Sequence, residues 1–414
     1  MVEVTKDDVR SFLEQFHAKM KIFGIIYRDD RGKNQNALEE LEIVPSFRKV
    51  IIENLEVEDY VEGPDHMHLI PFGGRRVDLP IKVDIMISPF TGKEMELMYE
   101  KRTWKFRGEL YEYIHASWLC ADTGERFATD ETDDAGYRQV TNQYRAKYGI
   151  PYTDEIIALR KRYGLSAAKM SLILGFGVNQ WRAYEDEEVP SVSNGRMIRS
   201  IADPSVFLSI LDSAKHVLGA SEYKKITSSV QTVIERKQRT GIAAYEHDRL
   251  FMCERGVENG YGITSVERLK SVILTILSQC GEVFCTKMNK LLFYIDFLSY
   301  RKAGKSLTGL TYRALPYGPV PERWDRIYAC FDEIVLEPRI IGDREGLVIV
   351  PVGEPDTVLL SAEDMKIISF ICTRFKDCSA ADISRISHEE EAWQSCSSNR
   401  LRIPYDYAFK LKAV

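Results

Sequence analysis

The chain has 414 residues, of which 44% are hydrophobic, and it carries a formal net charge of −6 at pH 7. This length predicts more than one domain, and the acidic balance excludes a basic surface spread over the whole molecule. No apolar run reaches the roughly 18 residues that span a bilayer, and the charged start of the chain lacks the apolar core of a signal peptide. We therefore expect a cytoplasmic protein that makes no membrane contact.

The cysteines and the catalytic motifs exclude several classes of protein. None of the eight cysteines forms a C-x-x-C pair, so reduced thiols are expected, with neither a disulfide framework nor a zinc site. The sequence contains no Gly-rich phosphate loop, nucleophile elbow or paired metal motif. We expect a protein that is not an enzyme, with no cofactor and no bound metal.

The first 135 residues predict two small units. Residues 1–85 read as an α+β module, with a helix over 5–20, a strand over 22–27, a polar loop over 29–34, and a Gly-, Pro- and His-rich join over 63–80. Residues 86–135 read as a β-rich region with strands over 95–98 and 103–106. Its end, 130–136, is acidic and is predicted to be a linker.

Residues 136–215 carry the pattern of a helix-turn-helix. Such a motif needs a small residue in its first helix, a Gly at the turn and apolar anchors in its second helix. Ser171, Gly175, Trp181 and Tyr184 meet these demands in order. The alternative is a plain helical bundle with a solvated polar face.

The residues of the motif that do not pack the two helices together would face DNA. Asn179 and Gln180 can pair with adenine and Arg182 with guanine, and Val178 lies beside them. Residues 138–200 hold ten Lys/Arg and six Asp/Glu, a local charge of +4 that opposes the sign of the whole chain. We expect phosphate contacts from the basic side chains around the motif: Arg160, Lys161, Lys169, Arg196 and Arg199.

This region resembles the DNA-binding half of MqsA-type antitoxins. The resemblance lies in residues 141–145, 165–166, 175–180, 184–185 and 189–190, and covers about residues 86–210. It implies a homodimer that binds operator DNA and represses its own operon, with Asn179 at the family's base-contacting position. The family's Arg falls on Ala183 here, and Arg182 lies one place earlier, so the operator sequence is not carried over.

The same family has a C-x-x-C zinc ribbon before its helix-turn-helix. The corresponding segments here are Ser88-Pro-Phe-Thr91-Gly and Cys120-Ala-Asp-Thr123-Gly, which keep one thiol. A structural zinc needs four Cys or His ligands, and His115 is the one spare donor nearby. We expect the ribbon to persist without metal, packed instead by Trp104, Phe106 and Trp118.

The remaining chain predicts a helical connector over 216–261 and a mostly helical domain over 262–414 with a small β-hairpin. Two helices are expected, one through residues 269–277 ending at Gly281 and one through 288–295 ending at Gly304. Segments 290–297, 304–312, 314–321 and 387–393 resemble the Panacea, or SocA-type, antitoxin domain. This resemblance implies a cognate protein toxin as the partner.

Within that domain, residues 316–321 predict a rigid, poorly hydrogen-bonded turn because they contain three prolines and a glycine. Tyr317 on this turn either anchors the toxin or packs the turn onto the domain. Tyr312 and Trp324 are further toxin-binding candidates. Residues 388–391 (His-Glu-Glu-Glu) predict a solvated helix start, with metal ligation as the alternative.

Segments 12–35 and 59–64 resemble the first half of MqsR-like toxins, which cleave mRNA. The later strands of that fold are missing from this chain, so no assembled acid/base pair is expected. We predict a multidomain, mainly α protein with small α+β units that acts as a type II antitoxin and autorepressor. The alternatives are a toxin–antitoxin fusion with residual N-terminal ribonuclease activity, and a repressor that senses another ligand or partner.

Overall fold

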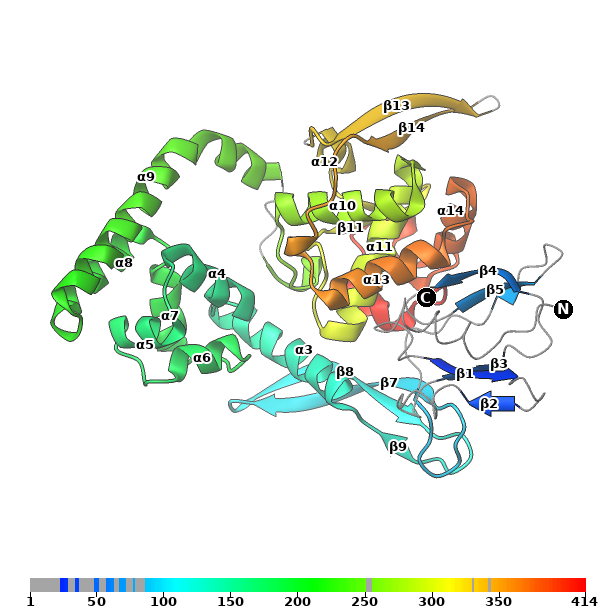
Figure 1. Cartoon of the computed structure of the whole chain (residues 1–414), viewed down its shortest axis with the longest axis horizontal. Coiled ribbons are helices and arrows are strands. Elements are labelled where there is room, and N and C mark those ends of the chain that lie inside the picture. The colour runs from blue at the N-terminus through cyan, green and yellow to red at the C-terminus, as the bar shows by residue number, and fades with distance from the viewer. Residues whose placement is uncertain are drawn as a thin grey trace.

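The computed structural model describes residues 86–250 and 255–414, apart from 330 and 342–343, and six short strands between residues 23 and 78. Helices dominate, and the sheets are small and mostly antiparallel (Figure 1). This mixture of α structure with small β units agrees with the predicted fold class. None of the helices in these residues has both the length and the apolar character needed to cross a membrane.

The N-terminal strands form two three-stranded sheets, of order β2-β1-β3 and β4-β5-β6. The strand predicted over 22–27 is confirmed as β1, and the join predicted over 63–80 is wrong, because it contains β5 and β6. The helix expected over 5–20 and most of the loop expected over 29–34 lie outside the described residues. The strands are β1 (Phe23–Arg28), β2 (Asn34–Asn36), β3 (Arg48–Ile51), β4 (Val57–Glu62), β5 (Met67–Pro71) and β6 (Val77–Asp78).

The β-rich region is a long antiparallel hairpin, where two short strands were expected. β7 (Glu96–Phe106) and β8 (Glu109–Leu119) pair along their whole length, and β9 (Arg126–Phe127) extends β8 on its other edge. The turn is Arg107-Gly108, and both residues have positive φ, at 48° and 90°. This is the backbone that a tight two-residue hairpin requires.

The segment predicted as an acidic linker is instead the start of helix α3 (Asp130–Tyr148). Thr129 and Thr132 form a reciprocal cap at its first turn, with hydrogen bonds of 3.3 and 2.9 Å. Acidic residues stabilise the positive end of the helix dipole, so the carboxylates at 130, 131 and 133 favour the helix. The prediction was wrong because the acidic residues were interpreted as a solvent-exposed linker and the helix cap was not recognised.

Residues 150–250 form a helical region around an apolar core. Tyr163, Trp181 and Phe207 are fully buried there, and the Tyr163 and Phe207 rings stack at 4.1 Å. Ile226 and Val230 belong to the same core, so the first turns of α9 pack on this region. The helices are α4 (Thr153–Tyr163), α5 (Ala167–Ile173), α6 (Gln180–Glu185), α7 (Val192–Ser200), α8 (Pro204–Ser213) and α9 (Ala220–Leu250).

The C-terminal region is built around α11, which is buried along most of its length and surrounded by the other helices. Both predicted helices are confirmed as α10 and α11, ending at Gly281 and Gly304. The helices of the C-terminal region are α10 (Val266–Cys280), α11 (Cys285–Ala303), α12 (Trp324–Ala329), α13 (Ala362–Arg374), α14 (Ala380–His388) and α15 (Glu391–Gln394).

Two β-hairpins accompany these helices, where one was predicted. The short hairpin pairs β11 (Tyr312–Leu315) with β12 (Gly318–Pro321). The long hairpin pairs β13 (Ile334–Ile341) with β14 (Arg344–Pro351), and β10 (Val283–Phe284) pairs with the other edge of β14. The long hairpin projects from the domain, as Figure 1 shows.

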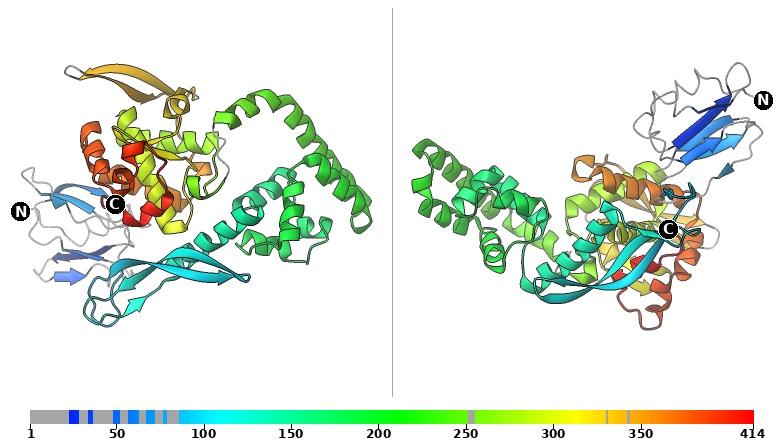
Figure 2. Two further views of the ribbon diagram at one scale, coloured as in Figure 1. Left: turned by 180° about the vertical axis from the view of Figure 1, so that it is seen from behind. Right: turned by 90° about the horizontal axis from the view of Figure 1, so that it is seen from below.

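Helix α3 packs against the C-terminal domain, whereas α8 and α9 lie on the opposite side from the N-terminal strands (Figures 1 and 2). The amide of Asn142 on α3 donates a hydrogen bond of 3.1 Å to the carbonyl of Gly304, where α11 ends. A Cβ at Gly304 would lie 3.1 Å from the carbonyl oxygen of Ala135. This close approach, together with a φ of 67°, explains the glycine.

Candidate functional sites

Helices α5 and α6 meet across a turn at Gly175, whose φ is 69°. Ser171 is buried, and its Oγ accepts a hydrogen bond of 3.0 Å from the backbone N–H of Trp181. Trp181 and Tyr184 are buried beneath α6. The residues predicted to pack the two helices together therefore do so.

The opposite face of α6 is open to solvent. Val178 is 82% exposed, and Asn179 and Arg182 are also exposed. Gln180 is half-buried and donates a 3.0 Å hydrogen bond to the carboxylate of Glu188. Gln180 is therefore held by a neighbour within the described part of the chain, which would compete with its predicted pairing to a base.

The basic side chains around α6 divide into two groups. Lys161, Arg196 and Arg199 are exposed, and Arg199 donates to the carbonyl of Gly149 at 2.9 Å. Lys169 instead lies 2.8 Å from the Glu222 carboxylate on α9. It is half-buried there and ties α5 to α9.

Arg160 has a bracing role that its sequence position did not reveal. Its guanidinium donates to both carboxylate oxygens of Glu185 on α6, at 2.6 and 3.0 Å. The same carboxylate accepts a 2.9 Å hydrogen bond from the Trp181 indole. Arg160 therefore holds α6 onto α4, and its expected phosphate contact would compete with this ion pair.

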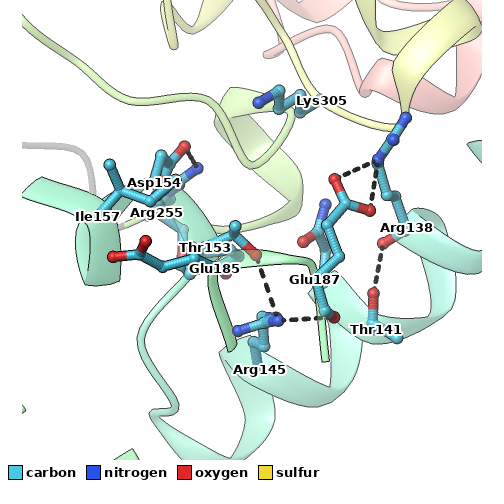
Figure 3. Close-up of a pocket in the computed structure, with 12 residues that line it drawn as sticks. Arg138, Thr141, Arg145, Thr153, Asp154, Ile157, Glu185, Glu187, Arg255 and Lys305 are labelled. Atoms are coloured by element: carbon cyan, nitrogen blue, oxygen red, sulfur yellow. Dashed lines mark hydrogen bonds and ion pairs between the residues drawn. The ribbon is translucent and has the colours of Figure 1, made fainter. Parts of the chain in front are cut away.

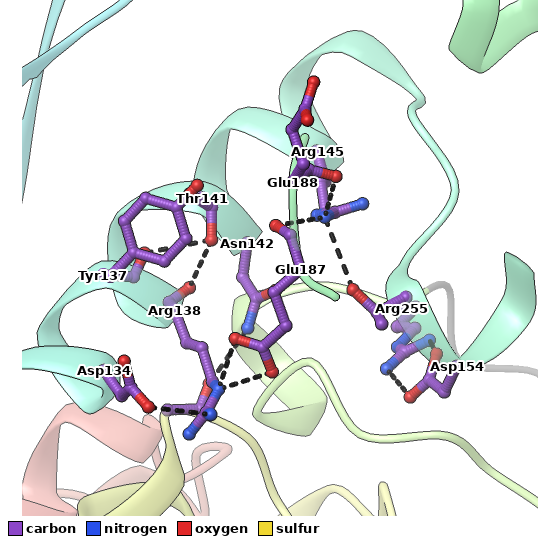
Figure 4. A network of polar contacts seen from close by, with 12 residues as sticks. Asp134, Tyr137, Arg138, Thr141, Asn142, Arg145, Asp154, Glu187, Glu188 and Arg255 are labelled. Carbon is purple, nitrogen blue, oxygen red and sulfur yellow. Dashed lines mark hydrogen bonds and ion pairs between the residues drawn. The ribbon is translucent and has the colours of Figure 1, made fainter. Parts of the chain in front are cut away.

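Arginines of α3 hold the segment that follows α6 (Figure 4). Arg138 donates two hydrogen bonds, of 2.8 and 2.9 Å, to the carboxylate of Glu187. Arg145 is buried, and its guanidinium donates to backbone carbonyls of Pro151, Glu187 and Glu188. Glu187 has a φ of 74°, a conformation that non-glycine residues rarely adopt, and these contacts hold it there.

A polar pocket of about 280 Å³ lies beside these arginines, between α3, α4 and residues of the C-terminal region (Figure 3). Arg255 donates to both carboxylate oxygens of Asp154, at 2.6 and 2.7 Å. Burial opposes ionisation of Asp154, but the hydrogen bonds from Arg255 outweigh it and lower the pKa of the carboxyl group. Two pairs of charged side chains in its lining, Arg255–Asp154 and Arg138–Glu187, are therefore ion-paired within the chain.

The segments corresponding to a zinc ribbon form two similar turns. Gly92 N–H donates to the Ser88 carbonyl at 2.9 Å, and Gly124 N–H donates to the Cys120 carbonyl at 2.8 Å. The Cys120 thiol donates to the Ser88 hydroxyl at 3.2 Å and lies 3.8 Å from the Thr91 hydroxyl. Hydrogen bonds with Ser88 and Thr123 lower the pKa of Cys120 to about 6.

One thiol and three hydroxyls do not fit a tetrahedral structural zinc, which takes Cys and His ligands. The described residues contain no group of three or more His, Cys, Asp or Glu side chains placed to hold a metal ion. Trp118 packs beside Cys120 as predicted. The predicted packing is wrong for Trp104 and Phe106, whose rings contact Tyr137 of α3 at the other end of the hairpin.

The toxin-binding candidates have different exposures. Tyr317 forms the tip of the β11–β12 hairpin with Pro316 and is 75% exposed. Trp324 is half-buried beside Tyr328. Tyr312 is fully buried, and its hydroxyl donates a 2.6 Å hydrogen bond to Asp296, so it offers no surface to a partner. The turn also differs from the prediction, because residues 318–321 are strand β12 and lie buried.

Residues 388–391 are not a solvated helix start. Helix α14 ends at His388 and α15 begins at Glu391, and Glu390 between them is 1% exposed. Its carboxylate accepts hydrogen bonds from the backbone N–H groups of Lys412 and Ala413, at 2.9 and 3.0 Å. The acidic run was misread because one of its three carboxylates anchors the C-terminal segment.

The comparisons with known proteins cover part of the chain. Residues 288–394 match the family model described as antitoxin SocA-like, Panacea domain. This segment runs from α11 to α15 and includes both the β11–β12 hairpin and the buried Glu390. No curated protein and no solved structure matches the chain.

Proposed function

We propose that this protein is an antitoxin that neutralises a cognate protein toxin through its C-terminal domain and represses its own operon through α5 and α6. The observation that carries the proposal is the match of residues 288–394 to the SocA-like Panacea antitoxin domain. The protein acts by binding rather than by catalysis, and it works in the cytoplasm. Its free thiols at Cys120, Cys285 and Cys372 suit a reducing compartment.

The DNA-binding part of the proposal rests on α5 and α6. A helix-turn-helix places the exposed face of its second helix in the major groove. Here the buried Trp181 and Tyr184 anchor α6, and Arg182 on the helix and Asn179 at its N-cap remain exposed. Lys161 and Arg196 lie exposed on neighbouring helices, where they would contact phosphates.

Operator binding also implies a dimer. One short helix contacts too few base pairs for specific binding, so two copies related by a two-fold axis would read a palindrome with half-sites about one helical turn apart. Footprinting on the promoter of the operon, with the mass of the complex measured in parallel, tests this. A monomer that protects a single half-site would contradict it.

Mobility shifts on the operator and on random DNA test the assignment of α6. Asn179→Ala and Arg182→Ala should each weaken operator binding by about 1–3 kcal/mol and leave random DNA unaffected. Lys161→Ala should weaken both and reduce the salt slope by about one. Lys169→Ala is the matched control, because Glu222 already holds that ammonium. Unchanged operator binding by Asn179→Ala and Arg182→Ala would rule out α6 as the reading helix.

A growth-rescue assay tests toxin neutralisation. The full chain is co-expressed with the protein encoded by the adjacent reading frame, and growth is compared with expression of that protein alone. Rescue with a soluble complex between the two chains is the expected result. Growth arrest that persists despite soluble, folded antitoxin would contradict the proposed function.

A further inference from the structure

The core of the C-terminal domain contains a buried amine that the described residues leave unpaired. Lys290 on α11 is 0% exposed, and its Nζ has no hydrogen-bond partner among them. Burial lowers the pKa of this amine to about 7, and no carboxylate contributes to the shift. A polar group buried without a partner destabilises the fold, so packing alone does not explain a lysine at this position.

A second unpaired group lies beneath the same hairpin turn. The Nε2 atom of His388 is buried without a hydrogen-bond partner in the described part of the chain. The His388 ring stacks on Trp393 at 4.0 Å and is hydrogen-bonded to the backbone of Pro316. Burial and the charge of Lys290 lower the pKa of this imidazole, so a charged amine disfavours protonation of the ring.

The turn of the β11–β12 hairpin covers both groups. Gly318 has a φ of 106°, and a Cβ there would lie 2.6 Å from Cε of Lys290 and 2.4 Å from the Ser387 hydroxyl. The Trp393 indole donates to the Leu315 carbonyl at 2.8 Å and holds the turn down. Tyr317, the exposed residue of this turn, precedes Gly318 directly. The amine therefore lies immediately beneath the surface that displays Tyr317.

The carboxylate of Glu390, two residues after His388, is already occupied. Glu390 accepts hydrogen bonds from the Tyr294 hydroxyl and from the backbone of Lys412 and Ala413. Tyr294 lies one turn after Lys290 on α11, so α11 directs one polar group to Glu390 and leaves the other unpaired. A carboxylate that bound between them would raise the pKa of both Lys290 and His388 and favour the ammonium and the protonated imidazole. Each charged group could then donate to one oxygen of the carboxylate.

We propose that Lys290 and His388 form a carboxylate-binding site beneath the Pro316–Gly318 turn, and that an acidic side chain of the protein toxin enters it when the toxin docks on Tyr317. The inference rests on the proposed toxin-binding function and names the chemistry of its interface. The turn must lift for the carboxylate to enter, so the hydrogen bonds to Leu315 and Pro316 break or lengthen in the complex. Tyr317 makes the first contact with the toxin, and Lys290 supplies the positive charge that binds its carboxylate.

Substituting Lys290 in the full chain separates binding from folding. Lys290→Met removes the amine and keeps an unbranched apolar stem of similar length. The variant should melt at a higher temperature than the wild type and bind the protein from the adjacent reading frame at least tenfold more weakly. Gain of stability with loss of binding is the signature of a group kept for function.

Lys287→Met is the matched control on the same helix. The Lys287 ammonium donates a 3.0 Å hydrogen bond to the carbonyl of Lys376, so it already has a partner. This variant should melt lower than the wild type and keep its affinity. Wild-type affinity in Lys290→Met would overturn the proposal, and so would weaker binding accompanied by a lower melting temperature, since that result indicates a structural role.

Acetate tests the site without the toxin. Melting temperatures are measured in sodium acetate and in sodium chloride at equal ionic strength and pH. A ligand that binds the native state stabilises it, so acetate should raise the melting temperature of the wild type more than that of Lys290→Met. Equal shifts would contradict the site. If acetate discriminates but the wild type binds no toxin, the proposed function fails and the carboxylate site stands.

Discussion

The α5–α6 region and the C-terminal domain differ in whether ionisable side chains are buried in their cores. Around α6 the apolar side chains are inside, and Ser171, buried at the helix contact, accepts a hydrogen bond from Trp181. The C-terminal domain instead buries ionisable groups, namely Lys290, Asp296 and Glu390. The α5–α6 region, which we propose reads DNA, has an apolar core and its exposed polar groups outside, whereas the C-terminal domain keeps some of its ionisable groups within the core.

The largest expected effect lies in the apolar core under α6. Trp181→Ala removes a fully buried indole and should lower the free energy of unfolding by about 3–5 kcal/mol. Chemical denaturation measures it. Val178→Ala on the same segment, 82% exposed, is the control and should change stability by less than about 0.5 kcal/mol. Similar losses in both variants would contradict the packing described.

The next effect concerns the buried carboxyl group of the C-terminal domain. Burial raises the pKa of Asp296 to about 6, against hydrogen bonds from Thr308 and Tyr312 that lower it. A raised folded-state pKa stabilises the fold at low pH, and this stability is lost as pH rises through about 4 to 6. The loss should amount to about 2–3 kcal/mol.

Unfolding measured between pH 4 and 7 checks this effect. Asp296→Asn cannot ionise and should flatten that part of the profile, while Asp382→Asn, at an exposed helix start, should not. A profile in Asp296→Asn that matches the wild type would show that this carboxyl group does not titrate in the range.

A somewhat smaller effect is expected at the hairpin tip. Tyr317→Ala should weaken toxin binding by about 2 kcal/mol if this side chain anchors the interface. Ile340→Ala, at an equally exposed position on the long hairpin, serves as the control. Calorimetric titration with the toxin distinguishes the two. Full affinity in Tyr317→Ala would leave this residue a role in packing the turn and move the toxin-binding surface elsewhere.

The smallest expected effect is that of metal removal. Because Ser88, Thr91 and Thr123 stand beside Cys120, the purified chain should contain no stoichiometric zinc, and a chelator should leave its melting temperature unchanged. Elemental analysis measures the first and thermal melting the second. One tightly bound zinc per chain would overturn this expectation.

The sequence predicted the regions whose residues follow a local rule. The helix ends at Gly281 and Gly304 and the anchors Ser171 and Trp181 each obey a spacing that one element imposes. The prediction for residues 130–136 was wrong, because the acidic residues indicated a linker and the helix cap at Thr129 was not recognised. Local patterns therefore predicted α5 and α6 well.

The features that the sequence did not reveal depend on residues far apart in the chain. Arg160 pairs with Glu185, Arg138 with Glu187, and Glu390 with the backbone at 412–413. Nothing in the local sequence distinguishes these charged residues from solvated ones. Lys290 is the extreme case, since its helical spacing gives no sign that the amine is buried beneath a hairpin contributed by residues 312–321.

The most direct test of the central claim measures both activities in one variant of the full chain. Asn179→Ala combined with Arg182→Ala should lose repression of an operon reporter and still rescue growth from the toxin. This result is expected because the substituted side chains are exposed at the start of α6 and on it, outside residues 288–394, which match the antitoxin family model. Retained repression, or loss of rescue by the folded variant, would contradict a chain that reads DNA with α6 and neutralises a toxin with its C-terminal domain.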